Sequence, residues 1–369
     1  MQRSTLRFEN AIKSEHTRKM YRYYLENFKK FVKIREDDGL LQLKESFLQE
    51  AVEDFLFDLK KKISPNSIPQ RFSALQLFFS MNDKVLNWEK IKKMFPATVK
   101  RTGGEAWSTQ DIKKMLESTK SKREKALIHF LASTGCRIGA IPDIKLKHVS
   151  DIENCKTVKI YEGTTEEYTV FLTPEASIVL DEYLNKRKSD GEILSSDSPL
   201  FRQRYRLGGA KVKPVNTVLL KAKMTDVIHA ANIERLKQGR RYSIQLDHGF
   251  RKRFNTLLKN NSIGNIALKE KLMGHKGVFD LDGRYHKPDV KTLFEEFKLH
   301  ITNLVISDSE RDKITIAKLS AEKSESDKKA MRIAELEEQV AAVIHKLDLI
   351  SGTKSEERKP PFTNESQLD

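Results

Sequence analysis

Hydrophobic residues recur every three or four positions through most of the first 95 residues, and this is the period of an amphipathic helix. The stretch 14–32 is an example, with apolar or aromatic side chains at Tyr21, Tyr24, Leu25, Phe28 and Phe31. The same period predicts three further helices, at 47–62, 65–79 and 87–94. Residues 1–14 lack it and are expected to be weakly ordered. We therefore predict a helical bundle over residues 1–95.

A second pattern begins after a break. Pro96, Gly103 and Gly104 interrupt the helical period, so residues 96–106 are predicted to be a linker. Residues 107–305 are expected to form a second domain, in which helical stretches surround one alternating segment at 156–172. Apolar residues at every second position on both sides of Gly163 predict a β-hairpin there. The fold class is thus mainly α with a small antiparallel β-sheet, an α+β arrangement.

The C-terminal residues have their own pattern. Residues 306–330 are polar and highly charged, and residues 352–369 are expected to be disordered. Within the segment 306–351, six apolar residues alternate three and four apart: Ile333, Leu336, Val340, Val343, Leu347 and Ile350. This heptad pattern predicts a short helix. Either the helix associates with another copy as a coiled coil, or it folds back onto the body.

Composition narrows the class of partner. The chain has 369 residues and a formal net charge of +16, which favours a polyanion such as double-stranded DNA. No apolar run approaches the roughly 20 residues of a transmembrane helix, and no secretory signal begins the chain. The two cysteines show no metal-ligand spacing, and no Gly-rich phosphate loop is present, so no cofactor is expected. We expect a protein of prokaryotic cytoplasm, and the Lys- and Glu-rich composition favours an archaeal or mobile-element origin.

Basic residues gather in two places that could contact DNA. In the predicted N-terminal bundle they lie at helix ends and on exposed faces: Lys60, Lys61, Lys62, Arg71, Lys90, Lys92 and Lys93. In the second domain the run 201–213 interleaves them with Phe201 and Tyr205: Arg202, Arg204, Arg206, Lys211 and Lys213. A solvated surface would produce the same pattern, so both interpretations stay open.

The residues 246–286 carry the candidate chemistry. His248 and Arg251 lie three apart at the start of a predicted helix, so their side chains project from nearly the same side. A second helix, capped by Ser262, is expected to turn Ile263 and Ile266 inward and to end at Gly274. His275 follows Gly274 directly, and Tyr285 lies ten residues later.

A second arginine is expected at the same site. Residues 127–134 form an apolar helix that Gly135 interrupts, and Arg137 follows just past the break. A basic side chain at a tight junction of two apolar segments is unusual unless it faces a cleft. Two arginines and a histidine can neutralise a phosphodiester while a tyrosine oxygen attacks it, which gives phosphoryl transfer without a metal.

The ordered set of motifs resembles the tyrosine recombinase (phage integrase) family. The resemblance rests on four motifs: Thr134-Gly135-Cys136-Arg137-Ile138-Gly139, His248-Gly249-Phe250-Arg251, Leu272-Met273-Gly274-His275 and Tyr285. It implies a catalytic set of Arg137, His248, Arg251 and His275 with Tyr285 as nucleophile. It also implies an N-terminal domain that clamps DNA and a tetramer on DNA.

One position departs from that family. The resemblance implies a catalytic Lys in the hairpin, but the turn here carries Glu162, Thr164, Thr165 and Glu166. Lys159, on the first strand, is the nearest candidate, and a solvated strand lysine would look the same. The motifs therefore favour a site-specific DNA recombinase. An accessory DNA-binding protein and an enzyme of the type IB topoisomerase kind remain as alternatives.

Overall fold

The computed structural model describes residues 2–99, 104–204, 212–238, 241–275 and 287–352. They form two compact units, Met1–Arg101 and Thr102–Asp369. The described parts are mostly helical, with a three-stranded antiparallel sheet and a short two-stranded one. The predicted fold class, mainly α with a small antiparallel sheet, is confirmed.

The first unit is a bundle of helices around an aromatic core. The helices that the period predicted are α2 (Glu15–Phe31), α4 (Glu45–Lys62), α5 (Ile68–Met81) and α6 (Trp88–Lys93), with a short 3-10 turn at Pro65–Ser67. Their apolar faces meet around Phe28, Phe55 and Phe79, and the ring of Phe28 packs edge to face with the other two. The helices of this unit are therefore held together by contacts between aromatic side chains rather than by contacts between charged ones.

The expectation of a weakly ordered N-terminus is wrong. Residues 3–10 form helix α1 (Arg3–Asn10), and a short helix α3 (Asp37–Gln42) follows α2. Phe8 is fully buried against Phe78 of α5, with ring centroids 5.6 Å apart. Burying one such aromatic side chain stabilises the fold by about 1.5–3 kcal/mol, so Phe8 anchors this short helix although its sequence is mostly polar.

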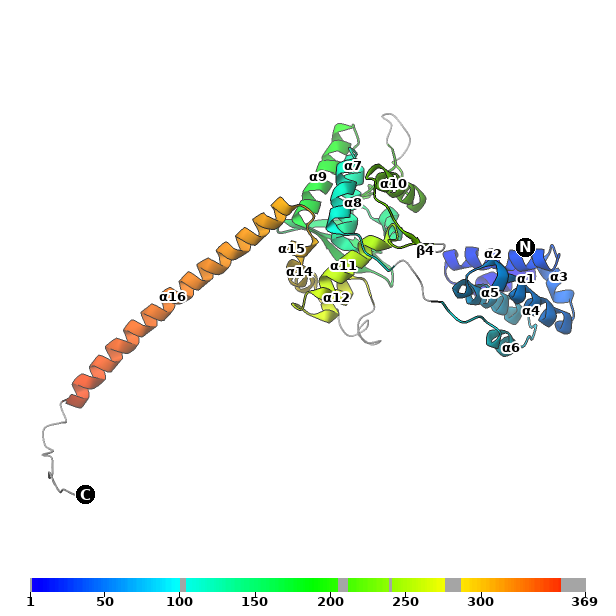
Figure 1. Cartoon of the computed structure of the whole chain (residues 1–369), viewed down its shortest axis with the longest axis horizontal. Helices are drawn as coiled ribbons and strands as arrows, with labels where there is room; N and C mark the ends of the chain where they lie inside the picture. The colour runs from blue at the N-terminus through cyan, green and yellow to red at the C-terminus, as the bar shows by residue number, and fades with distance from the viewer. Residues whose placement is uncertain (1, 100–103, 205–211, 239–240, 276–286, 353–369) are drawn as a thin grey trace, which may run out of the picture. The chain divides into compact units, whose positions relative to one another are not determined.

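The second unit surrounds its sheet with helices (Figure 1). The strands are β1 (Val149–Ile152), β2 (Cys155–Ile160) and β3 (Tyr168–Leu172), paired in the order β1-β2-β3. Helices α8 (Lys122–Thr134) and α9 (Pro174–Ser189) pack on each other and against this sheet. The remaining elements before the candidate site are α7 (Thr109–Ser118), 3-10 turns at Ile138–Asp143 and Leu146–His148, α10 (Thr217–Ala230), β4 (Lys237–Gln238) and β5 (Arg241–Tyr242).

The β2–β3 hairpin is the one that the alternation predicted. Val158 pairs with Val170, and Ile160 pairs with Tyr168 across the two strands. Val158, Ile160 and Val170 are buried, which leaves Lys159 on the opposite, exposed face. The register therefore settles the direction of Lys159: its side chain points away from the hydrophobic core.

Helices α11 (His248–Asn260) and α12 (Ile266–Leu272) carry the predicted site residues. The expected cap of the second helix is wrong, because Asn265, and not Ser262, accepts a hydrogen bond from the Ala267 amide. Ile263 and Ile266 consequently lie on the exposed side, 56% and 50% accessible, rather than inward. The helix still ends before Gly274, which takes a left-handed φ of 64° as expected for a residue that follows a helix.

The elements after the candidate site pack within the same chain. Phe294 and Phe297 of α14 (Val290–Lys298) are buried, and both rings lie within 5.3 Å of the Phe171 ring centroid on β3. Helix α15 (Ile301–Leu304) continues this packing against α11. The apolar face of α14 is thus covered by the core of the second unit.

The last element is α16 (Asp308–Gly352), a single helix of 45 residues. The short helix expected from residue 333 onward therefore begins 25 residues earlier. Charged pairs three or four residues apart support the polar part, among them Arg311–Asp308 and Lys329–Glu325. Within the described residues, no helix is long and apolar enough to span a membrane.

Candidate active site

Arg251 lies at the centre of the candidate site. It is on the first turn of α11 and only 9% exposed. Its guanidinium donates to the Gly135 carbonyl oxygen at 2.9 Å and to the Met273 carbonyl oxygen at 2.5 Å. The same group lies 3.1 Å from Nε2 of His275. One side chain thus joins the loop after α8 to the end of α12, segments more than 130 residues apart.

The junction at Gly135 is built as the sequence predicted. Gly135 follows α8 with a left-handed φ of 56°, and a Cβ there would lie 2.6 Å from Cβ of Phe254 on α11. Only glycine satisfies both constraints at low cost. The chain then turns outward, so Cys136 is buried while Arg137 is exposed. Burial raises the pKa of the Cys136 thiol to about 11, which keeps it neutral beside the arginine.

His275 is held by a carboxylate that sequence reasoning did not single out. Nδ1 of His275 lies 2.5 Å from Oε2 of Glu270, and Oε1 of Glu270 accepts from Lys259 Nζ. Burial alone would raise the pKa of the Glu270 carboxyl, but hydrogen bonds from Lys259 and His275 hold it below its usual range. A proton on Nδ1 facing Glu270 leaves Nε2 facing Arg251. The available signal was Glu270's place on α12 five residues before His275.

The other predicted residues are placed less closely. His248 is exposed at the first position of α11, one turn before Arg251. Tyr285 lies outside the described residues, so the nucleophile remains a prediction from the sequence. The structure brings Arg251 and His275 into contact and attaches the Arg137 loop to Arg251.

Two tyrosines of the hairpin lie near these arginines. The ring of Tyr168 packs against Gly274, where a Cβ would meet it at 2.6 Å. Burial raises the pKa of Tyr168 well above its usual range, and its hydroxyl has no hydrogen-bond partner among the described residues. Tyr161 lies near Arg137, and burial also raises its pKa. The motif order singles out Tyr285, and not these two tyrosines, as the predicted nucleophile.

The carboxylates of the hairpin turn contact one histidine and two cationic side chains. Glu162 pairs with Nε2 of His148 at 2.9 Å and lies 3.5 Å from Nζ of Lys159. Glu166 lies 3.9 Å from the Arg137 guanidinium. Both Lys159 and Arg137 therefore face a carboxylate of the turn while keeping about half of their side chains accessible.

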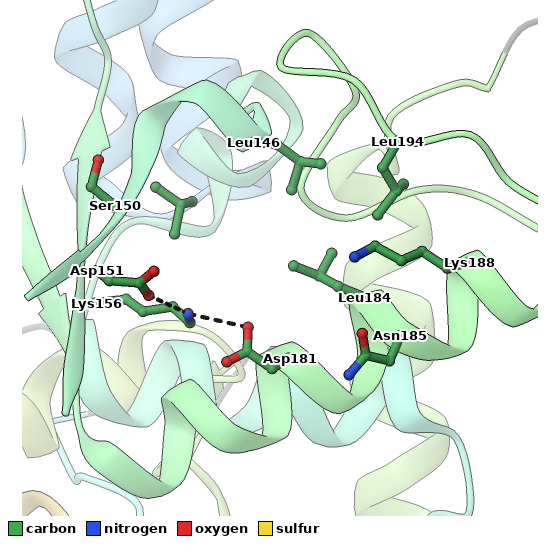
Figure 2. A pocket seen from close by; sticks show the side chains of 10 residues that line it. Leu146, Ser150, Asp151, Lys156, Asp181, Leu184, Asn185, Lys188 and Leu194 are labelled. Carbon is green, nitrogen blue, oxygen red and sulfur yellow. Dashed lines mark hydrogen bonds and ion pairs between the residues drawn. The ribbon is translucent and has the colours of Figure 1, made fainter.

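A groove elsewhere in this unit lacks such chemistry. It encloses about 540 Å³ between the β1 edge and α9, and Figure 2 shows its lining. Lys156 lies there between Asp151 and Asp181, with its ammonium 2.6 Å and 3.1 Å from the two carboxylates. These charges neutralise one another, and none of the predicted catalytic residues lines the groove.

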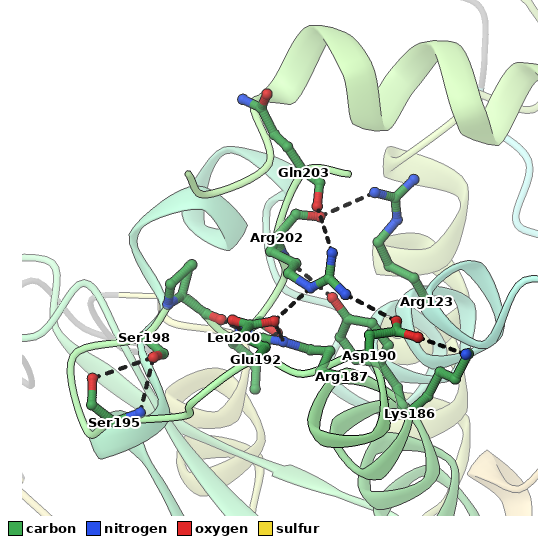
Figure 3. A network of polar contacts seen from close by, with 12 residues as sticks. Arg123, Lys186, Arg187, Asp190, Glu192, Ser195, Ser198, Leu200, Arg202 and Gln203 are labelled. Carbon is green, nitrogen blue, oxygen red and sulfur yellow. Dashed lines mark hydrogen bonds and ion pairs between the residues drawn. The ribbon is translucent and has the colours of Figure 1, made fainter. Parts of the chain in front are cut away.

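The predicted DNA-contact strip at 201–213 is wrong for its first two members. Phe201 is buried, and Arg202 is buried in the ion-pair network of Figure 3. The Glu192 carboxylate pairs with the guanidinium groups of Arg187, at 2.5 Å, and Arg202, at 2.6 Å. The Asp190 carboxylate lies 3.2 Å from the Arg202 guanidinium. Buried charges need such partners, so these arginines stabilise the loop base. Arg204 and Lys213 are exposed, whereas residues 205–211 lie outside the described part.

No group of three or more His, Cys, Asp or Glu side chains within the described ranges could hold a metal ion. The charges that converge here are instead guanidinium and imidazole groups, which suit a phosphate.

The model of the phage integrase family matches residues 105–291, half of the sequence and all the residues of the candidate site. The chain belongs to the phage integrase family. This confirms the resemblance stated from the motifs. It also assigns α7 to the start of α14 to the part of the molecule that defines the family.

A curated relative in this family is the tyrosine recombinase XerA of Saccharolobus solfataricus, 26% identical over 201 residues. The matched region is 53% of this chain and 57% of that relative, so the chain spans little more than half of the relative's length.

Two solved integrase structures share the fold. The integrase of the Tn1549 transposon, in complex with transposon right-end DNA, matches with a TM-score of 0.54 and 14% identity. That match covers 80% of this chain and 98% of the other. A lambda integrase dimer bound to a core site matches with a TM-score of 0.50 and 12% identity, over 75% and 92% of the two chains. At these identities the likeness establishes the phage integrase fold alone.

Proposed function

We propose that this chain is a site-specific DNA recombinase that cuts and rejoins strands through a covalent tyrosine intermediate. The observation that carries the proposal is the Arg251 guanidinium, fixed between the Gly135 loop and α12 and in contact with His275. Membership of the phage integrase family and the net charge of +16 support DNA as the substrate.

In the proposed reaction the Tyr285 oxygen bonds to the scissile phosphorus while the bond from phosphorus to the 5′ oxygen breaks. The products are a 3′-phosphotyrosine and a free 5′ hydroxyl. Arg137, Arg251 and His275 stabilise the charge on the non-bridging oxygens, and His248 helps to move the proton released by the phenol. The ester conserves the bond energy, so rejoining to another 5′ hydroxyl needs neither ATP nor a metal.

Arg251 and Arg137 have different parts in this proposal. Arg251 donates to two carbonyl oxygens and carries further N–H groups, so it can bind a phosphate without leaving its place. Arg137 is exposed and must exchange Glu166 for the phosphate. Glu270 orients His275 through Nδ1, so that Nε2 faces the arginine and the space beside it.

The leaving 5′ oxygen needs a proton, and we propose Lys159 as its donor. Lys159 is on the exposed face of the hairpin and lies near the turn. The turn itself carries Glu162 at its second residue and no lysine. The absence of a lysine from this turn is the observation that favours the second candidate function, an accessory DNA-binding protein that keeps the fold without strand transfer.

The assembly that we propose is a homo-oligomer on DNA, a tetramer during strand exchange, in a prokaryotic cell. Exchange of strands between two duplexes needs four cuts, hence four copies with one nucleophile each. A matching structure of lambda integrase is a dimer bound to a core site, which supports DNA-directed assembly. The basic N-terminal bundle is proposed to clamp the duplex: Lys61, Lys92 and Lys93 are exposed, whereas Lys90 pairs with Glu53.

The test begins by selecting bound duplexes from a random-sequence library and footprinting the recovered site. A nicked version of that site then traps the covalent adduct, because the short 5′ fragment diffuses away after cleavage. We expect the parent chain to form the adduct and Tyr285→Phe to lose it. The matched control is Tyr161→Phe, which removes the hydroxyl near Arg137 and should still form the adduct. Absence of any adduct would favour the accessory role, and an adduct on another tyrosine would refute the assignment.

Paired sites separate the remaining alternatives. Recombinant products from two sites identify a recombinase, whereas relaxation of supercoils without recombinants identifies a topoisomerase-like enzyme. Binding to the selected duplex should also weaken steeply with salt, with log K falling linearly with log salt concentration, because phosphate contacts release counterions. A flat salt response would contradict the charge argument.

A further inference from the structure

The distal part of α16 exposes an apolar face. Every side chain from 331 to 347 is exposed in the described structure. Six large apolar members are between 44% and 58% accessible: Ile333, Leu336, Val340, Val343, Ile344 and Leu347. A shallow apolar groove of about 390 Å³ runs along them between Ile333 and Ile344. Burying one such side chain is worth about 1.5–3 kcal/mol, so this face is a strong candidate for a partner.

The spacing of these residues indicates another helix as the occupant. Ile333, Val340 and Leu347 fall on the a positions of a heptad, and Leu336, Val343 and Ile350 fall on the d positions. The opposite f positions are Met331, Glu338 and His345. Ile344 adds one apolar side chain at an e position, whereas the a and d positions are apolar in each successive heptad. A stripe that recurs at a and d suits interlocking with a similar helix. The alternative of folding back onto the body finds no support, because the stripe is uncovered.

The flanking charges select the identity and direction of the partner. Arg332 is on a g position and Glu337 on the following e position. In two parallel copies in register, residue g of one helix lies beside residue e of the next heptad of the other, so Arg332 meets Glu337 twice. An antiparallel pair matches g with g and e with e, which separates these two charges. Arg332 also pairs with Glu335 on its own helix, and its fork has donors for both carboxylates.

We propose that residues 333–347 of α16 bind a second copy of this chain as a parallel, in-register coiled coil. This stretch of about two heptads is short, since stable isolated coiled coils need about three to four. The contact is therefore weak between free chains and strong between copies that another contact already holds near each other. This inference does not depend on the proposed reaction, because it concerns a face remote in sequence from the catalytic set.

Cysteine cross-linking in the full-length protein tests both contact and direction. The two native cysteines are buried, so an added cysteine is the accessible thiol among the described residues. Val340→Cys places thiols at matching a positions, and we expect a disulfide-linked dimer under mild oxidation. Glu338→Cys, on the outer f position two residues away, should stay monomeric under the same conditions. Equal cross-linking of both variants, or none, would overturn the proposal.

Direction has its own arm in mixed samples. Val340→Cys and Val343→Cys chains are mixed and oxidised together. If Val340→Cys forms more disulfide with Val343→Cys than with a second Val340→Cys chain, the pair is antiparallel and the parallel register is refuted. Analytical ultracentrifugation without DNA adds the charge test. Arg332→Glu or Glu337→Arg alone should weaken self-association several-fold, and the double exchange should restore it.

The control for the charge test is Glu338→Arg, which makes the same charge change on the outer face and should leave association unchanged. Circular dichroism checks that each variant keeps its helix. A double exchange that stays as weak as the single ones would exclude the Arg332–Glu337 contact and with it the proposed register.

Discussion

Arg251 and Arg137 are joined through one loop, yet the protein holds them in different ways. Arg251 is 9% exposed and donates to two backbone carbonyl oxygens, whereas the Arg137 side chain is 44% exposed and lies 3.9 Å from a single carboxylate. The same division extends to their neighbours. His275 is oriented by Glu270 on the α12 side, while Lys159 and Glu166 stand on an exposed turn.

The difference teaches which part of the site is already formed without DNA. On the α11–α12 side the polar groups are fixed by buried hydrogen bonds, which cost little reorganisation when a phosphate arrives. On the hairpin side each cation must first release a carboxylate, in contacts that water screens. We therefore expect substitutions on the first side to affect folding and chemistry together, and substitutions on the second side to affect chemistry or DNA binding alone.

The largest expected effect is on the free energy of unfolding, compared between two single variants in which one arginine is replaced by alanine. Arg251→Ala leaves the Gly135 and Met273 carbonyl oxygens without their donor and should lower the free energy of unfolding by about 2–5 kcal/mol. Arg137→Ala should change it by no more than about 0.5 kcal/mol, because the side chain is exposed. Urea denaturation measures both. Equal losses would break the comparison.

The next effect asks whether the hairpin supplies the general acid. Lys159→Ala should slow strand cleavage by about 100-fold or more without changing stability. A substrate with sulfur in place of the bridging 5′ oxygen should restore the rate, because a thiolate, with a thiol pKa near 8.5, leaves without a proton. Lys147→Ala, an exposed lysine of the same unit, is the control. A defect that sulfur does not repair would remove Lys159 from the acid role.

A smaller effect is expected from the carboxylate behind His275. Glu270→Gln keeps the size of the side chain but loses its charge, and should slow cleavage by about 10-fold, the lower range for a residue that orients a histidine. In Glu270→Gln, nitrogen-15 NMR of His275 should show a weaker hydrogen bond from the Nδ1 proton than in the parent chain, even without DNA. Lys259→Met, which leaves the carboxylate in place, serves as control. An unchanged His275 spectrum in Glu270→Gln would contradict the orienting role.

Acid provides a second view of Glu270. Its carboxyl pKa is held below the ordinary value of 4.5, so the folded state is stabilised above that pH. The contribution is lost as the pH falls below 4.5 and through the lower pKa of the folded state, because the folded carboxylate then takes up a proton. The stability of the parent chain should consequently approach that of Glu270→Gln in this range. A constant difference between the two at all pH values would argue against the pKa shift.

The smallest effect concerns the carboxylate that faces Arg137. Glu166→Gln should raise affinity for the selected duplex by up to about fivefold at low salt, since an exposed pair is worth about 0.2–1 kcal/mol. Glu117→Gln, the same charge change on the exposed face of α7, corrects for net charge. A gain equal to that of the control would mean that Glu166 does not compete with phosphate.

Where the apolar pattern was strong, the sequence sufficed. The apolar period located the main helices, and Gly135 marked the turn before Arg137, because only glycine tolerates both its φ and the neighbouring Phe254. The family resemblance implied that Arg251 and His275 belong to one site, and the structure adds that the two side chains are in contact.

The sequence failed where side chains of ambiguous character decide the outcome. Asn265 capped α12 instead of Ser262, since both residues are good caps and only packing chooses between them. Arg202 matched the pattern of a DNA contact, but the fold brings Asp190 and Glu192, twelve and ten positions before it, beside its guanidinium. Glu270 was overlooked because its place five residues before His275 does not by itself show that the two side chains meet.

The packing of Gly135 on Phe254 has a mechanical consequence. The Arg251 guanidinium donates to the same loop, so the corner between α8 and the following 3-10 turn, which bears Arg137, is fixed to the start of α11 as one stiff block. Prising them apart would open the hydrophobic interior. If the described part of the site rearranges when DNA binds, we therefore expect the change at the exposed turn of the β2–β3 hairpin rather than within this block.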